Sequence, residues 1–405
     1  MNLLQDGISN QSVMKTEYLK RLTIDNHSED YEVYKIKLNC LYYNDQNDRI
    51  ATWISQYKAE NNITHLDISE TEEYNNLVHK FVTESNELSI RTTQKNIELV
   101  GQQEYGVVLA DGRIIDGNRR FTCLRNIQKE TSQTQYFEAV ILKHDIHNNA
   151  KQIKMLELML QHGTDEKIPY NPIDKLVGVY NDIIERQLLT PEEYAKSING
   201  KKSDVLSDMD RAVLMVEFLE FINAPKQFHL ARTMNINSPL AELQKISKKC
   251  PDDDKKEDLK NIIFANILMR PEGDMTRYIR LINKIVINES TLDGYIEEQI
   301  EDADLLCNTV ENYSIVNEKI IRDEIRTNQE LSNKFEKATD KWSAKADGIT
   351  TKNFPAKQSA DALNKLEAID VNILGKLDDQ QKDNIRSCLD SIQDIIDLMR
   401  SEMDV

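Results

Sequence analysis

Residues 114–125, IIDGNRRFTCLR, combine the end of a strand, a tight turn and the start of a helix. Two isoleucines favour the strand, and Phe121 and Leu124 recur at the spacing of one helix face. Arg119 and Arg120 then fall in the first helical turn, where the helix dipole disfavours positive charge. This placement needs an explanation.

A helix N-terminus carries unpaired backbone N–H groups and a partial positive charge, so it attracts anions. Arg119 and Arg120 would add two guanidinium groups that suit phosphate oxygens. Gly117 would let a ligand approach the backbone, because it has no side chain. Spacing alone leaves two interpretations open: a phosphate or polyphosphate site, or two arginines that face solvent or pair with acids.

The composition bounds the class of protein. The chain has 405 residues, 40% hydrophobic and 30% charged, with only 12 glycines and 8 prolines, which favours a mostly helical protein with a packed core. No apolar run is long enough for a membrane span. A net charge of −18 repels the DNA backbone, so only a local basic patch could contact DNA, and protein partners are favoured.

The cysteines indicate a compartment. Five cysteines, an odd number without a CxxC pair, predict free thiols in a reducing cytoplasm and no structural zinc site. The opening MNLLQDGISNQS also lacks the pattern of a secretory signal. We therefore expect a cytoplasmic protein.

An α+β domain is expected over residues 1–150. Residues 1–30 are polar and predict a loose arm or an irregular lead-in, and 111–112 (Asp-Gly) predict a two-residue hairpin turn. The other expected elements are strands at 31–44 and 135–145, helices at 48–61, 70–85 and 119–129, and a hairpin at 104–117.

From residue 150 onward the pattern is helical. The expected elements are helices at 150–163 and 171–187, a helix at 190–199 with a Thr190–Glu193 capping box, and a helix at 203–222 capped by Ser203. The last two have the size and glycine turn of a helix-turn-helix. The expected domains are 151–240 (helix-turn-helix-like), 241–344 (helical), a linker at 345–358 and a terminal helical hairpin at 359–405, suited to dimerisation or docking. The acidic run 250–258 predicts a solvated loop.

The stretch DGRIIDGNRRFTCLR (111–125) resembles the Gly-Glu-Arg-Arg box of the ParB/sulfiredoxin-like superfamily, in its Asp-Gly-Asn-Arg-Arg form. Three further segments resemble family boxes and follow the family's order: VYKIKLNCLYYNDQNDRI (33–50), LELMLQHGTDEKIPYNPIDKLVGVY (156–180) and LTPEEYAKSINGKKSDVLSDM (189–209). A fourth segment, KNIELVGQQEYGVVLADG (95–112), is similar to the stretch that leads into the family's second box. The resemblance runs from about residue 31 to 225.

The resemblance implies a small mixed-sheet domain that binds a nucleoside triphosphate, CTP or ATP, with Mg²⁺. Carried over to this sequence, Gly117, Asn118, Arg119 and Arg120 would bind the phosphates. Asp116 would orient an arginine or a metal-bound water. Some relatives hydrolyse the nucleotide or act as nucleases, so an NTPase or nuclease activity is implied as an alternative.

The third box departs from the family pattern. It aligns on Gln161, so Leu158 and Met159 stand where an acid and an amide are expected, and His162 replaces the final arginine. Glu157, one position away, is the substitute candidate for a metal ligand. The catalytic candidates are accordingly weak: Asp116, Glu157, Gln161 and His162. Asn118 stands where sulfiredoxins have a cysteine, so the redox branch fits worse.

The helix-turn-helix departs as well. Its second helix carries aspartates where DNA-reading helices carry Arg, Lys, Asn or Gln. Lys201, Lys202 and Arg211 are the candidate DNA contacts, and a structural module is the alternative.

Three functions follow as hypotheses. The first is a nucleotide-dependent switch in DNA partition, mobile-element or phage-defence processes. The second is a nuclease or DNA-processing component. The third is a non-enzymatic adaptor whose acidic helices bind a protein.

Overall fold

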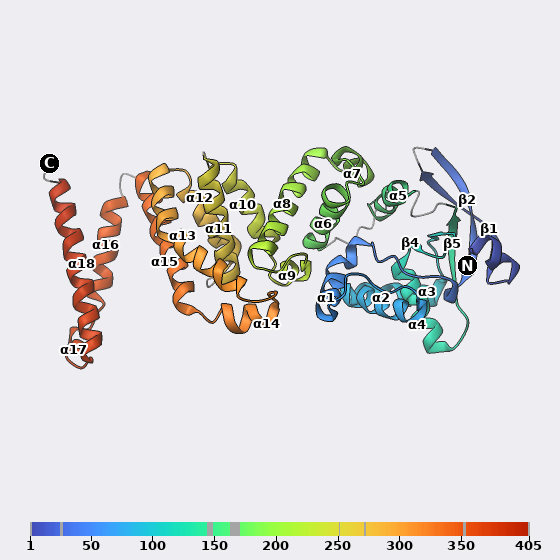
Figure 1. Cartoon of the computed structure of the whole chain (residues 1–405), viewed down its shortest axis with the longest axis horizontal. Helices are drawn as coiled ribbons and strands as arrows, with labels where there is room; N and C mark the ends of the chain where they lie inside the picture. The colour runs from blue at the N-terminus through green and yellow to red at the C-terminus, as the bar shows by residue number, and fades with distance from the viewer. Residues whose placement is uncertain are drawn as a thin grey trace. The chain divides into compact units, whose positions relative to one another are not determined.

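The computed structural model describes residues 2–24, 27–143, 149–162, 171–250, 252–270, 273–350 and 354–403. The chain divides into two compact units, Met1–Trp342 and Ser343–Val405. The first unit begins with a five-stranded mixed sheet and continues as a helical region (Figure 1), which confirms the expected α+β class.

The sheet has the strand order β1-β2-β5-β3-β4, in which β3 and β5 are parallel and the other neighbours are antiparallel. Its strands are β1 (Val13–Ile24), β2 (His27–Lys37), β3 (Gly106–Leu109), β4 (Ile114–Asp116) and β5 (Tyr136–Leu142). The helices and helical turns between them are η1 (Leu3–Gly7), η2 (Leu38–Cys40), η3 (Asp48–Ile50), α1 (Ala51–Asn61), α2 (Thr71–Ser85), α3 (Glu87–Val100) and α4 (Asn118–Thr131).

Both faces of the sheet are covered, because successive side chains of a strand point to opposite sides. On β5, Phe137 and Ala139 pack in a buried cluster with side chains of α1, α2 and α4. Val140 and Leu142 join a second cluster with α5 (Ala150–His162). The turn between β4 and α4 therefore lies where strand and helix are both held by buried packing.

The expected loose arm at residues 1–30 is wrong. Residues 3–7 form η1, and β1 pairs with β2 along most of its length. Only Val13 and Leu22 of β1 are buried. Since β1 is an edge strand held mainly by backbone hydrogen bonds, its polar side chains gave no hydrophobic alternation to detect.

The hairpin between β3 and β4 has a different turn from the expected one. Gly112 N–H donates to Leu109 O at 3.0 Å, and Leu109 N–H donates to Arg113 O at 2.8 Å. These bonds close a three-residue loop in which Gly112 has φ of 98°. A type I turn followed by a glycine in a left-handed conformation is a common hairpin solution, and it replaces the two-residue turn.

The helical region follows α5. Its elements are α6 (Pro172–Val179), η4 (Tyr180–Glu185), α7 (Pro191–Ser197), α8 (Lys202–Phe221), α9 (Phe228–Thr233), α10 (Asn237–Ser247), α11 (Asp253–Met269), α12 (Met275–Ile285), α13 (Glu289–Glu311), α14 (Glu318–Ile320), η5 (Ile321–Ile325) and α15 (Gln329–Thr350). One buried cluster runs from Ile173 to Trp342 and includes residues on both sides of the boundary expected at 240. Helices on both sides of residue 240 thus share one core, while α7 packs in a separate cluster with α5.

The caps of α7 and α8 differ from each other. The Thr190–Glu193 capping box is confirmed, with both reciprocal hydrogen bonds present. Helix α8 begins at Lys202 with Lys201 at its N-cap and no side-chain cap, so Ser203 is not the cap. Ser203 instead donates to the carboxylate of Asp204, a competing partner for the hydroxyl.

The linker expected at 345–358 is helical wherever it is described. Helix α15 continues to Thr350 because Ala338, Trp342 and Ala346 prolong one buried face at four-residue spacing. Residues 351–353 lie outside the described part, and α16 (Phe354–Glu367) begins directly after them. The second unit also contains α17 (Val371–Leu374) and α18 (Asp379–Met403).

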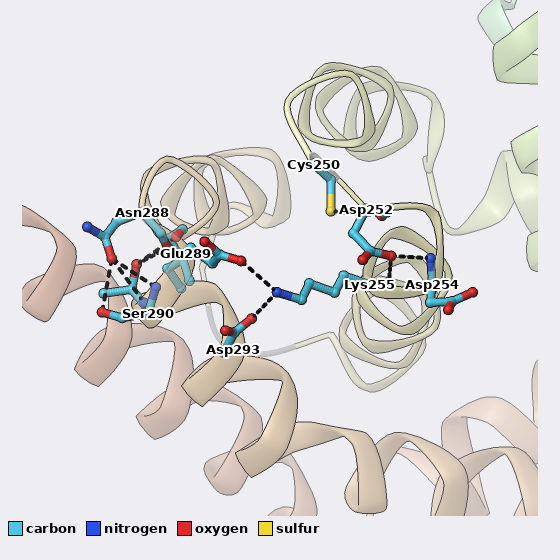
Figure 2. Close-up of polar contacts among 10 residues, drawn as sticks. Cys250, Asp252, Asp254, Lys255, Asn288, Glu289, Ser290 and Asp293 are labelled. Carbon is cyan, nitrogen blue, oxygen red and sulfur yellow. Dashed lines mark hydrogen bonds and ion pairs between the residues drawn. The ribbon is translucent and has the colours of Figure 1, made fainter.

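Residues 253–258 of the acidic run at 250–258, which was expected to be a loop, belong to α11. Figure 2 shows Asp252 as the N-cap of α11, where its side chain accepts the backbone N–H of Asp254 at 2.8 Å. Lys255 Nζ reaches from α11 to Glu289 at 3.2 Å and Asp293 at 2.7 Å on α13 (Figure 2). The run caps one helix and ties it to another.

Other expectations concern the whole chain. All five cysteines are free thiols. Among the described residues, no helix is both long and apolar enough to cross a membrane.

Candidate functional site

The β4–α4 turn is built around Gly117, which has φ of 107° at the N-cap of α4. A Cβ at this position would lie 2.7 Å from Phe137 Cζ, inside van der Waals contact. The ring of Phe137 thus fills the space beside Gly117 that was predicted to admit a ligand. Gly117 is required by backbone conformation and by packing, and it offers no side chain to cap the first turn of α4.

Arg120 is held by the protein itself. Its Nη2 donates to Asp116 Oδ2 at 2.8 Å, and its Nη1 donates to the carbonyl oxygen of Glu104 at 2.7 Å. Lys20 of β1 also contacts Asp116, at 3.9 Å, and donates to the carbonyl oxygen of Tyr105. Arg120 therefore connects the end of β4 to the segment just before β3, and Asp116 orients this arginine.

Arg119 has a different environment. Within the described residues it makes no hydrogen bond or ion pair, although it is only partly exposed. Burial is the largest cause that lowers the pKa of its guanidinium to about 10, and the charge of Arg49, on η3, is the second. A partly buried guanidinium beside another arginine is a site that an anion would stabilise.

Asn118, the first residue of α4, adds a second unsatisfied group. It is 8% exposed, and its Oδ1 has no hydrogen-bond partner among the described residues. Amide oxygen and nitrogen positions are interchangeable by rotation, so either a donor or an acceptor can be offered here. Two of the four residues predicted to bind phosphate, Asn118 and Arg119, thus have free polar capacity at one helix N-terminus.

The loop that carries Arg49 is fixed from both sides. Asn47 accepts the backbone N–H of Arg49 at 3.0 Å and caps η3. Arg113 donates to Asp45 at 3.4 Å, while its guanidinium lies 5.2 Å from the ring centre of Tyr42. Residues 42–50 are therefore held by contacts of their own side chains and of Arg113.

Helix α5 places Glu157 in a buried cluster of charges. Lys154 Nζ lies 3.0 Å from Asp48 Oδ1 and 3.6 Å from Glu157 Oε2, and Gln161 donates to Glu157 at 3.0 Å. Asp182 of η4 completes the cluster at 3.3 Å from Lys154. His162 belongs to α5, but its side chain lies outside the described part.

The protonation of this cluster is set by burial. Desolvation raises the pKa of Glu157 and of Asp182 to about 7, with Lys154 opposing the rise and Asp48 adding to it. Burial opposes the charge of Lys154, but the three carboxylates outweigh it and hold its pKa well above the usual value. The lysine is therefore charged, and the carboxyl groups of Glu157 and Asp182 gain or lose their protons near neutral pH.

The candidate DNA contacts are mostly engaged elsewhere. Lys202 forms an ion pair with Glu192. Arg211 contacts Asp208 at 3.3 Å and donates to Asn237 at 3.2 Å. Lys201 is exposed and has no ion pair among the described residues.

The sequence did not single out Arg49, Asp48, Lys154 or Asp182. One signal was present: Lys154 and Glu157 carry opposite charges at i,i+3 beside Leu158, on a face that the apolar residues of α5 otherwise mark as buried. In comparisons with known proteins, no family model and no curated protein matches the chain.

Proposed function

We propose that the chain binds a nucleoside triphosphate, CTP or ATP, at the N-terminus of α4 and acts as a nucleotide-dependent switch of the ParB-like kind. One observation carries the proposal: Arg119 is a partly buried guanidinium without a partner among the described residues, and Arg49 is its strongest charged neighbour. Two partly buried cations that lie near each other are stabilised when an anion binds between them.

A polyphosphate suits this arrangement better than a single carboxylate. Its oxygens can accept hydrogen bonds from two guanidinium groups and from the uncapped N–H groups of the first turn of α4 at the same time. The amide of Asn118, whose Oδ1 has no partner among the described residues, adds a donor when it rotates its nitrogen toward the ligand. Arg120 stabilises the turn and does not itself contact the ligand, because its donors already bind Asp116 and Glu104.

The processes proposed for the switch are DNA partition, mobile-element maintenance or phage defence. They rest on the resemblance of residues 31–225 to ParB-like boxes. The α7–α8 pair is the proposed helix-turn-helix, and Lys201 is its one exposed candidate without an ion pair among the described residues. Direct contact with DNA would be weak, since the net charge of −18 opposes it.

The test is equilibrium binding of CTP and ATP by titration calorimetry with Mg²⁺ present. We expect micromolar affinity for one nucleotide and a loss of about tenfold or more in Arg119→Ala, since charge-assisted hydrogen bonds contribute about 1.5–3 kcal/mol. Arg91→Ala, which removes an exposed arginine of α3, is the control with the same change of charge. If neither nucleotide binds the wild-type protein, the proposal is wrong.

A second function is favoured by the C-terminal helices. None of the described residues of α16, α17 and α18 is buried. Along α18, apolar side chains recur at alternating spacings of four and three: Ile385, Leu389, Ile392, Ile396 and Met399. This is the spacing of a coiled-coil seam. We propose that this seam holds a second copy of the chain or a helix of a protein partner.

The seam is tested by the molar mass of the protein in solution, measured by light scattering after size exclusion. We expect a dimer that dissociates in Ile392→Asp and persists in Ser391→Asp, where the same charge falls on an exposed position outside the seam. A monomeric wild-type protein would rule out self-association and leave the docking of a different protein.

A further inference from the structure

The cluster around Lys154 contains Glu157, the residue that the sequence offered as a metal ligand. Lys154 Nζ lies 3.0 and 3.1 Å from the two carboxylate oxygens of Asp48, 3.3 Å from Asp182 Oδ2 and 3.6 Å from Glu157 Oε2. None of the four side chains has a residue exposure above 6%. One ammonium group is thus surrounded by carboxylates from η3, α5 and η4.

These residues do not fit a divalent cation. Mg²⁺ needs oxygen ligands at about 2.0–2.1 Å in near-octahedral geometry. Here the point on which the carboxylates converge is filled by the ammonium, which also repels a second cation in a medium of low dielectric constant. The described residues contain no group of three or more His, Cys, Asp and Glu side chains that could hold a metal ion.

The cluster is linked to the anion site by one peptide bond. Asp48 and Arg49 are consecutive in η3; Asp48 binds Lys154, while Arg49 is the charged neighbour of Arg119. Gly178 of α6 also packs against Asp48, since a Cβ there would lie 2.7 Å from the carboxylate. The lysine therefore fixes the turn that presents Arg49.

We infer that Lys154 takes the place of a divalent cation, so that anion binding at Arg119 and Arg49 needs no metal ion. Lys154 acts as a positioning residue: it neutralises carboxylates that would otherwise repel a phosphate, and it holds η3 in place. The inference rests on the proposed nucleotide function, but its central claim about the cluster can be tested without nucleotide.

The first experiment titrates the full-length protein with CTP, ATP and inorganic triphosphate, once with excess Mg²⁺ and once with EDTA. The expected dissociation constants agree within about threefold between the two conditions. Binding that weakens by about tenfold or more in EDTA would overturn the inference while leaving the proposed function intact. Failure of all three ligands in both conditions overturns the proposed function, and the second experiment then decides the inference.

The second experiment measures Mn²⁺ binding by electron paramagnetic resonance without nucleotide. Wild type and Glu157→Gln should give the same titration, because Glu157 faces an ammonium and not a metal. A saturable Mn²⁺ site in wild type that is lost in Glu157→Gln would overturn the inference. Lys154→Met removes the ammonium and should create a Mn²⁺ site; if this variant does not fold, the wild-type comparison still decides.

Discussion

Replacing each arginine of the β4–α4 turn by methionine should have opposite consequences for stability. In Arg119→Met the apolar stem is kept, and a charge without a partner among the described residues is removed. Burial and the charge of Arg49 lower the pKa of this guanidinium, so its charged form is less stable in the folded protein than in the unfolded chain. After allowance for solvent screening of a partly exposed group, we expect the free energy of unfolding to stay unchanged or rise by up to about 1 kcal/mol.

Arg120→Met removes two charge-assisted hydrogen bonds, at 2.8 Å to Asp116 and 2.7 Å to the carbonyl oxygen of Glu104. Such bonds contribute about 1.5–3 kcal/mol each, and they are not fully additive. Among the described residues, the carboxylate of Asp116 would then keep Lys20 as its one charged partner, at 3.9 Å. We therefore expect the free energy of unfolding to fall by about 2–4 kcal/mol.

The measurement is denaturant unfolding of both variants and the wild type in one buffer without nucleotide. The two substitutions are matched, since they lie one residue apart and remove the same group. If Arg119→Met is as destabilising as Arg120→Met, then Arg119 has a structural partner and the argument for an anion site fails.

Three further outcomes are expected. Gly117→Ala should lower the free energy of unfolding by about 2–5 kcal/mol, because φ is 107° and the new Cβ meets Phe137 at 2.7 Å; unchanged denaturation would contradict this. Burial raises the pKa of Glu157 from 4.5 to about 7, so the folded state binds this proton more tightly than the unfolded state, and stability is lost as the pH rises through that range. Glu157→Gln should therefore make the free energy of unfolding depend less on pH. An identical slope in both proteins would refute the raised pKa of Glu157. Arg232→Lys should lower the melting temperature and the free energy of unfolding, the latter by about 1–2 kcal/mol. The guanidinium lies 4.1 Å from the ring centre of Trp53 and also donates a hydrogen bond to a side chain of α1 at 2.7 Å, and a lysine cannot make both contacts. Equal melting temperatures would show that these contacts do not stabilise the protein.

Local rules predicted the elements that bury one clear face. Helix α2 was expected from apolar residues at helical spacing, and it buries Tyr74, Val78 and Phe81. The start of α7 followed from the Thr190–Glu193 box alone. In both cases the pattern that specifies the element lies within the element.

Elements that depend on distant partners were missed. Helix α3 was not predicted, because it buries only Ile90 and leaves Leu88 and Leu99 exposed at 77% and 83%. Strand β1 depends on β2 for its hydrogen bonds, and no pattern within residues 13–24 indicates this pairing. Tertiary pairing supplied the stability that local propensity did not.

The sequence predicted the turn, but it could not show that Arg119 and Arg120 make different contacts. Consecutive residues of a helix point about 100° apart, so Arg119 and Arg120 meet different parts of the protein. Their surroundings come from Arg49 in one case and from Glu104 in the other, more than ten residues away along the chain. Adjacent identical residues therefore acquired different roles through contacts that only the folded chain creates.

The charge cluster explains how the helical region can affect that turn. Asp48 belongs to the loop that carries Arg49, Lys154 to α5 and Asp182 to η4. A buried ion pair gains little net stability, but removal of one partner is costly, so the three segments are held in one arrangement or lose it together. Under the proposed function, a ligand that displaced Arg49 would act on η4 through the ion pairs of Lys154 with Asp48 and Asp182, without any contact of its own to the helices. The physical requirement for a switch is such a shared element, whose position both the ligand and the helical region bias.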